Sequence, residues 1–198
     1  MWTEAERVYA AGLTPVVLVG GKSVRFGRDK LREPWGDGVL VERPIGVLRE
    51  VFGARVMVVG ACDARVRALG DGEIADGYAG VGPMGGVVSA LEGCGGAVFV
   101  LAGDMPGFCA ERARELVRVA AVMRGEVEAV LCETDRLQVC AGIYERRALA
   151  RLRGALDEGR YSLVRAMEGA GEGAVVARVR CEEGEVRNVN TPGDVSDG

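Results

Sequence analysis

The chain has 198 residues, of which 48% are hydrophobic and 27% are charged. This balance is typical of a globular protein and excludes a disordered chain, and the length fits one domain with a substantial core. The net charge of −4 provides no broad basic footprint for nucleic acid, so a phosphate ligand would have to be held by local cations. We therefore expect one domain over residues 1–198 and no nucleic-acid partner.

The types of reactive side chain in the sequence limit which catalytic mechanisms are possible. There is no histidine, which excludes a Ser-His or Cys-His nucleophile and a histidine general base. The six cysteines show no C-x-x-C spacing, so we expect no structural zinc site. Scattered cysteines are typical of a reducing compartment, and neither a signal peptide nor a transmembrane run is apparent. We expect a cytoplasmic protein without membrane contact.

Strand-like and helix-like segments alternate along the chain. After a short helix within residues 1–14, the expected strands are 16–19, 55–60, 73–75, 97–102, 127–132, 139–144 and 174–179. A turn cluster is expected at 34–38, and the expected helices are one from Val39 onward, then 61–69, 87–91, 110–123, 147–156, 161–167 and a short one with Thr191 as N-cap and Pro192 at its first position. Run 97–102 is apolar on both faces, as a central strand should be. The pattern predicts an α/β fold: a mostly parallel sheet between two helical layers, Rossmann-like and three-layered.

The first strand ends abruptly at Gly20 and Gly21, where the backbone can turn sharply and bring its N–H groups close to a ligand. Four cationic side chains follow, at Lys22, Arg25, Arg28 and Lys30. Backbone donors and cations converging after a strand favour a polyphosphate site. The loop is neither a Walker A motif nor a dinucleotide-binding fingerprint, because the glycines that those motifs require are absent.

Two carboxylates follow other strands. Ligands of open α/β sheets bind beyond the carboxyl ends of the strands, where Asp76 and Asp104 are expected. A carboxylate at the end of an apolar strand suits Mg²⁺, which commonly uses one or two carboxylates together with substrate phosphates. Taken alone, Asp104 could equally cap a helix or form a turn before Pro106, and Asp76 is more typical of a turn residue before Gly77.

Four motifs in order along nearly the whole chain resemble the molybdenum cofactor guanylyltransferases, within the nucleotidyltransferase superfamily. The first is Leu-x-Gly-Gly-x-Ser-x-Arg-Phe-Gly-x-Asp-Lys over residues 18–30. The others are Gly82-Pro83-Met84-Gly85-Gly86, Gly103-Asp104-Met105-Pro106 and Asn188-Val189-Asn190-Thr191-Pro192-Gly193-Asp194. The resemblance implies a fold of the nucleotide-diphospho-sugar transferase type and the transfer of GMP from GTP to the phosphate of molybdopterin, with Mg²⁺ and release of pyrophosphate.

The resemblance also implies roles for individual residues. The catalytic residues would be Arg25, Lys30 and Asp104. The nucleotide-binding residues would be Leu18, Val19, Gly20, Gly21, Lys30, Gly60, Asp76 and Asp104. The metal ligands would be Asp104 and, on weaker grounds, Asn190. The partners implied are GTP and a molybdopterin-type acceptor, with contact to enzymes that make or use the molybdenum cofactor as a further hypothesis.

Three departures from the family pattern bear on these roles. Val19 stands where the family has Ala, Gly60 where it often has Asn, and residues 138–141 where it more often has a proline-containing segment. Two other interpretations stay open: a relative that uses CTP or another acceptor phosphate, and a nucleotide-binding relative that has lost catalysis. The presence of both Lys30 and Asp104 counts against lost catalysis.

Overall fold

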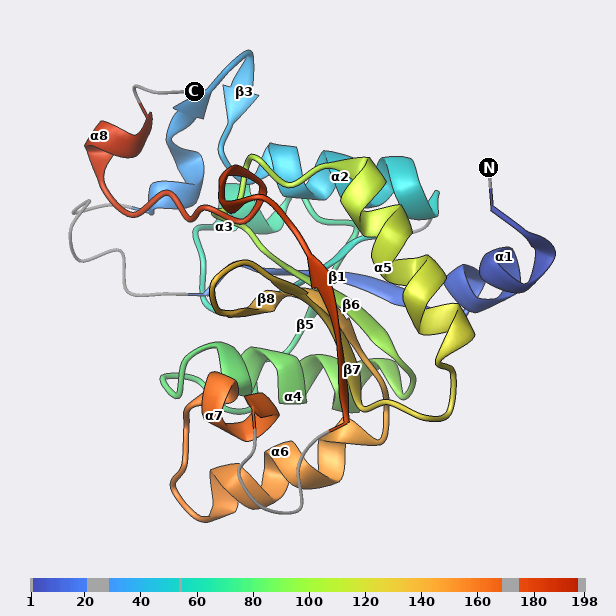
Figure 1. Ribbon diagram of the computed structural model, residues 1–198. Helices are drawn as coiled ribbons and strands as arrows, with labels where there is room; N and C mark the ends of the chain where they lie inside the picture. Colours follow the sequence, from blue (N-terminus) through green and yellow to red (C-terminus); the bar gives the residue numbers. More distant parts are fainter. Residues whose placement is uncertain (1, 21–28, 54, 169–174, 196–198) are drawn as a thin grey trace.

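The computed structural model describes residues 2–20, 29–53, 55–168 and 175–195 (Figure 1). Its main sheet has seven strands in the order β5-β4-β1-β6-β8-β7-β9. Their bounds are β1 Thr14–Leu18, β4 Met57–Val59, β5 Gly72–Ile74, β6 Val98–Ala102, β7 Ala129–Glu133, β8 Leu137–Tyr144 and β9 Val176–Arg180. Strand β8 runs antiparallel to β6 and β7, whereas the pairs β1–β4, β1–β6, β4–β5 and β7–β9 are parallel. The prediction of a mostly parallel sheet is confirmed.

Helices cover both faces of this sheet (Figure 1). One layer contains α1 Glu4–Ala11, α2 Glu42–Phe52 and α5 Ala110–Val122, and the other contains α4 Pro83–Cys94, α6 Ala148–Asp157 and α7 Leu163–Glu168. The side chains of a strand point alternately to the two faces, so Val16 packs with the second layer and Val17 with the first. Strand β6 is buried at every position, as predicted for the centre of the sheet. The three-layer α/β prediction is confirmed.

The short elements differ most from expectation. Residues 34–38, predicted as a turn cluster, include a small hairpin of β2 Pro34–Trp35 and β3 Gly38–Val39. The helix predicted over 61–69 is only α3 Ala64–Arg67, because Asp63 caps it by accepting a hydrogen bond from the backbone N–H of Arg65. The remaining short elements are η1 Lys30–Arg32, η2 Glu183–Glu185 and α8 Pro192–Val195. Helix α8 begins at Pro192, as predicted.

Helix α2 forms although it contains Pro44 and Gly46. Pro44 lies in the first turn of the helix, where the backbone N–H has no intrahelical acceptor, so the missing donor costs little. Gly46 is exposed, and a Cβ atom built on it would have no neighbour within 4 Å. The helix ends at Gly53, whose left-handed conformation (φ +56°) suits a C-cap.

Two glycines are expected to respond in opposite ways to a methyl group. A Cβ atom on Gly142 in β8 would lie 2.3 Å from the carbonyl oxygen of Val130, so Gly142→Ala should destabilise the fold by about 1–3 kcal/mol. Gly46→Ala has free space and should stabilise α2 by about 0.5–1 kcal/mol. Urea unfolding of both variants measures this difference. Equal stabilities would contradict the close approach of β8 to β7.

Candidate functional site

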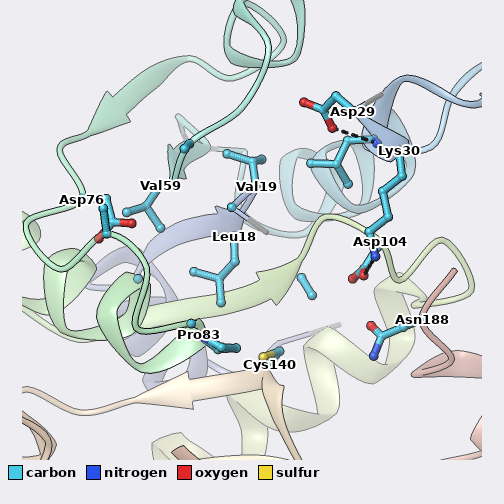
Figure 2. Close-up of a pocket in the computed structure, with 18 of the residues that line it drawn as sticks. Leu18, Val19, Asp29, Lys30, Val59, Asp76, Pro83, Asp104, Cys140 and Asn188 are labelled. Atoms are coloured by element: carbon cyan, nitrogen blue, oxygen red, sulfur yellow. Dashed lines mark hydrogen bonds and ion pairs between the residues drawn. The ribbon is translucent and has the colours of Figure 1, made fainter. Parts of the chain in front are cut away.

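A cavity of about 800 Å³ lies beyond the carboxyl ends of the parallel strands. This is where ligands bind in open α/β sheets, and the volume suits a small-molecule site. The residues that line it are Leu18, Val19, Gly20, Asp29, Lys30, Leu31, Val59, Gly60, Ala61, Asp76, Ala79, Gly80, Gly82, Pro83, Gly86, Ala102, Asp104, Cys140, Asn188 and Asn190. Figure 2 shows Leu18 near the centre, with Asp76 and Asp104 on opposite sides of it.

The ends of β1 and β4 approach each other through a pair of glycines. Gly60 has φ +115°, and a Cβ atom on it would lie 2.5 Å from the backbone nitrogen of Gly20. A side chain at position 60 therefore has no room in this backbone arrangement. Only the main chain of Gly60 and Gly20 can contact a ligand here.

Lys30 and Asp104 form an ion pair at the other side of the cavity. The Nζ atom of Lys30 lies 2.5 Å from Oδ2 of Asp104, and each side chain is 18% exposed. Lys30 begins the short helix η1, whose first turn Asp29 caps by accepting a hydrogen bond from the N–H of Leu31. The second carboxylate oxygen of Asp29 accepts a hydrogen bond from the N–H of Asp63, which ties η1 to the loop after β4. Figure 2 shows Lys30 extending toward Asp104.

The C-terminal segment joins this ion pair. The N–H of Val189 donates to the carbonyl oxygen of Asp104 at 2.9 Å, and Nζ of Lys30 donates to the carbonyl oxygen of Val189 at 3.0 Å. The residues on either side of Val189 are Asn188 and Asn190, and both line the cavity. The long-range contacts thus bring two amide side chains to the Lys30–Asp104 pair.

Asp194 holds the end of this segment. Its carboxylate accepts hydrogen bonds from the backbone N–H groups of Asn190 and Thr191 and from the Thr191 hydroxyl. These bonds, with a smaller contribution from Arg187, lower the pKa of Asp194 from 3.8 to about 2. The lowered pKa means that the contacts stabilise the folded chain fully above pH 3.8 and lose this effect as the pH falls toward 2.

Cys140 contributes a thiol from the antiparallel strand β8. Burial, together with the nearby negative charge of Asp104, raises the pKa of the Cys140 thiol to about 12. The thiol is therefore protonated at neutral pH and is a poor nucleophile. Each of the six cysteines is a free thiol in this structure.

The structure brings most of the predicted site residues into one cavity. Those that line it are Leu18, Val19, Gly20, Lys30, Gly60, Asp76, Asp104 and Asn190. Gly21 and Arg25 lie outside the described residues. Asn188, Asp29 and Cys140 also line the cavity but were not predicted as site residues. Asn188 and Asp29 lie inside the motifs already singled out, whereas Cys140 lies in the segment 138–141, which was noted only as a departure from the family pattern.

A divalent cation fits the side of the cavity that holds Asp104. Among the described residues there is no group of three histidine, cysteine or acidic side chains that could hold a metal. The cavity offers instead the Asp104 carboxylate and the amide oxygens of Asn188 and Asn190. These are hard oxygen donors, and Mg²⁺ is usually held by few protein ligands completed by substrate phosphates and water.

The sequence matches the family description "MobA-like NTP transferase domain" over residues 15–172. The chain belongs to this family. It is 33% identical to the "Probable molybdenum cofactor guanylyltransferase" of Opitutus terrae, over 93% of this chain and 94% of that protein. None of the helices in the described part of the chain is long and apolar enough to span a membrane.

Two solved structures share the fold of this chain. Molybdopterin-guanine dinucleotide biosynthesis protein A of Archaeoglobus fulgidus superimposes with a TM-score of 0.74 at 23% identity, covering 93% of this chain and 96% of that one. A Mycobacterium tuberculosis protein, Rv0371c, solved in complex with manganese, superimposes with a TM-score of 0.66 at 17% identity, covering 94% of this chain and 97% of that one. At these identities the likeness concerns the fold.

A methyl group on Gly60 should weaken the binding of a nucleoside triphosphate. The substituted Cβ would push against Gly20, and overpacking of this kind costs about 1–3 kcal/mol. We expect Gly60→Ala to raise the dissociation constant about tenfold by calorimetric titration. Gly154→Ala in α6 is the control, because a Cβ there has no neighbour within 4 Å. Unchanged affinity in Gly60→Ala would show that the two glycines are not held in contact.

Proposed function

We propose that residues 1–198 act as one nucleotidyltransferase domain that transfers GMP from GTP to the phosphate of molybdopterin and releases pyrophosphate. The observation that carries this proposal is the Lys30–Asp104 pair, joined by Val189 at the ends of the sheet strands in a cavity of about 800 Å³. Membership of the MobA-like NTP transferase family and the name of the Opitutus terrae relative support it. The cytoplasm is the compartment we propose.

The proposed roles of the residues fall into three groups. The nucleotide would be contacted by the backbone of Leu18, Val19, Gly20, Gly21 and Gly60. Asp76 would contact its base or ribose. Lys30, together with Arg25, would neutralise the phosphates. Asp104, aided by Asn190, would hold Mg²⁺ against the phosphates, and the manganese complex of the Mycobacterium tuberculosis protein with the same fold supports a divalent cation here.

The reaction suits a chain without histidine. An oxygen of the acceptor phosphate attacks the α-phosphorus of GTP, and the bond from that phosphorus to the bridging oxygen breaks, with the electron pair leaving on pyrophosphate. The attacking phosphate is already anionic at neutral pH, so no general base is needed. Such transfers depend mainly on positioning and on stabilising the developing charge. The Lys30 ammonium supplies that stabilisation, and bound Mg²⁺ would add Lewis-acid activation of the phosphates.

Nucleotide selectivity tests the proposal directly. With purified protein, Mg²⁺ and molybdopterin, we expect pyrophosphate release with GTP and none with CTP, ATP or UTP. Release with CTP instead would move the chain to a cytidylyltransferase. Binding of GTP without release by any nucleotide would favour another acceptor phosphate or a protein that has lost catalysis. EDTA should abolish release, and added Mg²⁺ should restore it.

Two substitutions test the ion pair. Asp104→Asn keeps the shape of the side chain but removes its charge, and Lys30→Ala removes the ammonium. Loss of one preorganised charged group typically costs about 10²–10³-fold in rate, so we expect kcat to fall by that factor in each variant. The control is Arg118→Ala, which removes an exposed ion pair with Glu111 on α5 and should leave kcat unchanged. Full turnover by Asp104→Asn would show that the charge of Asp104 is not needed, and full turnover by Asp104→Ala would rule out a metal-binding role for that residue.

A further inference from the structure

Helix α4 shapes the loop that carries Asp76. A Cβ atom on Gly85 would lie 2.6 Å from the carbonyl oxygen of Tyr78, so the glycine allows the loop to pack directly on the helix. Two turns further on, Glu92 accepts a hydrogen bond from the Tyr78 hydroxyl at 3.1 Å. Ser89 lies between these two contacts along the helix. The loop is therefore held along one side of α4.

The Ser89 hydroxyl makes two hydrogen bonds to the same loop. It donates to Oδ1 of Asp76 at 3.3 Å and accepts from the backbone N–H of Gly77 at 3.1 Å. Ser89 is 4% exposed within a buried stretch of the helix whose other residues, 84–91, are apolar or glycine. A buried hydroxyl is costly unless it is hydrogen-bonded, and here both bonds go to the Asp76 loop.

Both hydrogen bonds that Asp76 accepts within the described part of the chain end on one oxygen. The N–H of Tyr78 also donates to Oδ1, at 3.0 Å, so Ser89 and Tyr78 share that atom. Within the same residues, Oδ2 accepts no hydrogen bond. Asp76 lines the cavity, whereas Ser89 does not. The two donors thus fix the orientation of the carboxylate and leave Oδ2 to accept a bond from a ligand.

We propose that Ser89 is a positioning residue for nucleotide recognition, acting through Asp76. The inference rests on the proposed function, because it requires Asp76 to accept a hydrogen bond from the nucleoside, from either a ribose hydroxyl or a base N–H. Ser89 restricts rotation of the Asp76 carboxylate before the ligand arrives, which reduces the entropy lost on binding. It also satisfies the Gly77 N–H, so the loop keeps its conformation.

Ser89→Ala separates a positioning role from a structural one. We expect the dissociation constant for Mg²⁺–GTP, measured by calorimetric titration, to rise about three- to tenfold, as is typical for loss of a hydrogen bond of the kind that orients the Asp76 carboxylate. KM for GTP should rise by the same factor with kcat unchanged within about twofold, because in the proposed function the reacting phosphates are held by Lys30 and Asp104 and not by this loop. Val88→Ala is the matched control: it removes two buried methyl groups beside Ser89 in the same helix and leaves the Ser89 hydroxyl in place. It should lower the melting temperature and leave GTP affinity unchanged.

A double-mutant cycle with Asp76→Ala tests whether Ser89 affects GTP affinity through Asp76. If Ser89 acts through Asp76, adding Ser89→Ala to Asp76→Ala changes the GTP dissociation constant by less than about twofold. An undiminished effect in the Asp76→Ala background, or unchanged affinity in the single variant, would overturn the proposal. Where circular dichroism shows that Ser89→Ala is unfolded, Ser89→Cys replaces it, because the thiol has a similar size and bonds weakly.

Nucleotide analogues identify the donor that Asp76 accepts. A Ser89→Ala effect that disappears with 2′-deoxy-GTP or 3′-deoxy-GTP assigns the contact to the ribose, and one that persists with both assigns it to the base. The same titrations separate this inference from the proposed function. If the unsubstituted protein binds CTP and not GTP, only the assignment as a guanylyltransferase is overturned. The affinities of the unsubstituted protein and of Ser89→Ala are then compared with CTP. Absence of binding of any nucleoside triphosphate would overturn both.

Discussion

The site depends on the contacts of the Lys30 ammonium, because they join segments that are far apart in the sequence. It lies 2.5 Å from the Asp104 carboxylate at the end of β6 and 3.0 Å from the carbonyl oxygen of Val189 near the C-terminus. The backbone N–H of Val189 in turn donates a hydrogen bond to the carbonyl oxygen of Asp104, so the three residues are linked in pairs. A single side chain from the first loop thus places both the carboxylate and the two asparagine residues that flank Val189.

The C-terminal segment reaches Lys30 from the far edge of the sheet. Strand β9 is an edge strand, and the chain must return from it to β6 near the centre. Arg112 on α5 holds this return: its guanidinium donates to the carbonyl oxygen of Arg180 at 2.7 Å and to the Glu185 carboxylate at 3.0 Å. Arg112 and Glu185 are largely buried, so their pairing is less screened than a surface ion pair. The return path is therefore anchored before the segment enters the cavity.

The opposite side of the cavity depends on close backbone contact. Strand β1 lies between β4 and β6, which brings the loops after these strands together, and Gly20 against Gly60 allows the closest approach. Helix α4 then fixes the Asp76 loop through Gly85 and Ser89. One side of the cavity is thus built mainly from main chain and the other from charged side chains. This division suits a ligand with a nucleoside at one end and phosphates at the other.

The sequence by itself determined the α/β class, most strands and long helices, the family, and eight of the twenty residues that line the cavity. These rest on apolar periodicity and on motifs, which are properties of short segments. The tertiary structure alone decided that β8 runs antiparallel and carries Cys140 into the cavity, that Asn188 joins Asn190 there, and that the Ser89 hydroxyl faces Asp76. Strand register and the direction of a buried side chain depend on contacts between residues distant in the chain, and local patterns do not encode them.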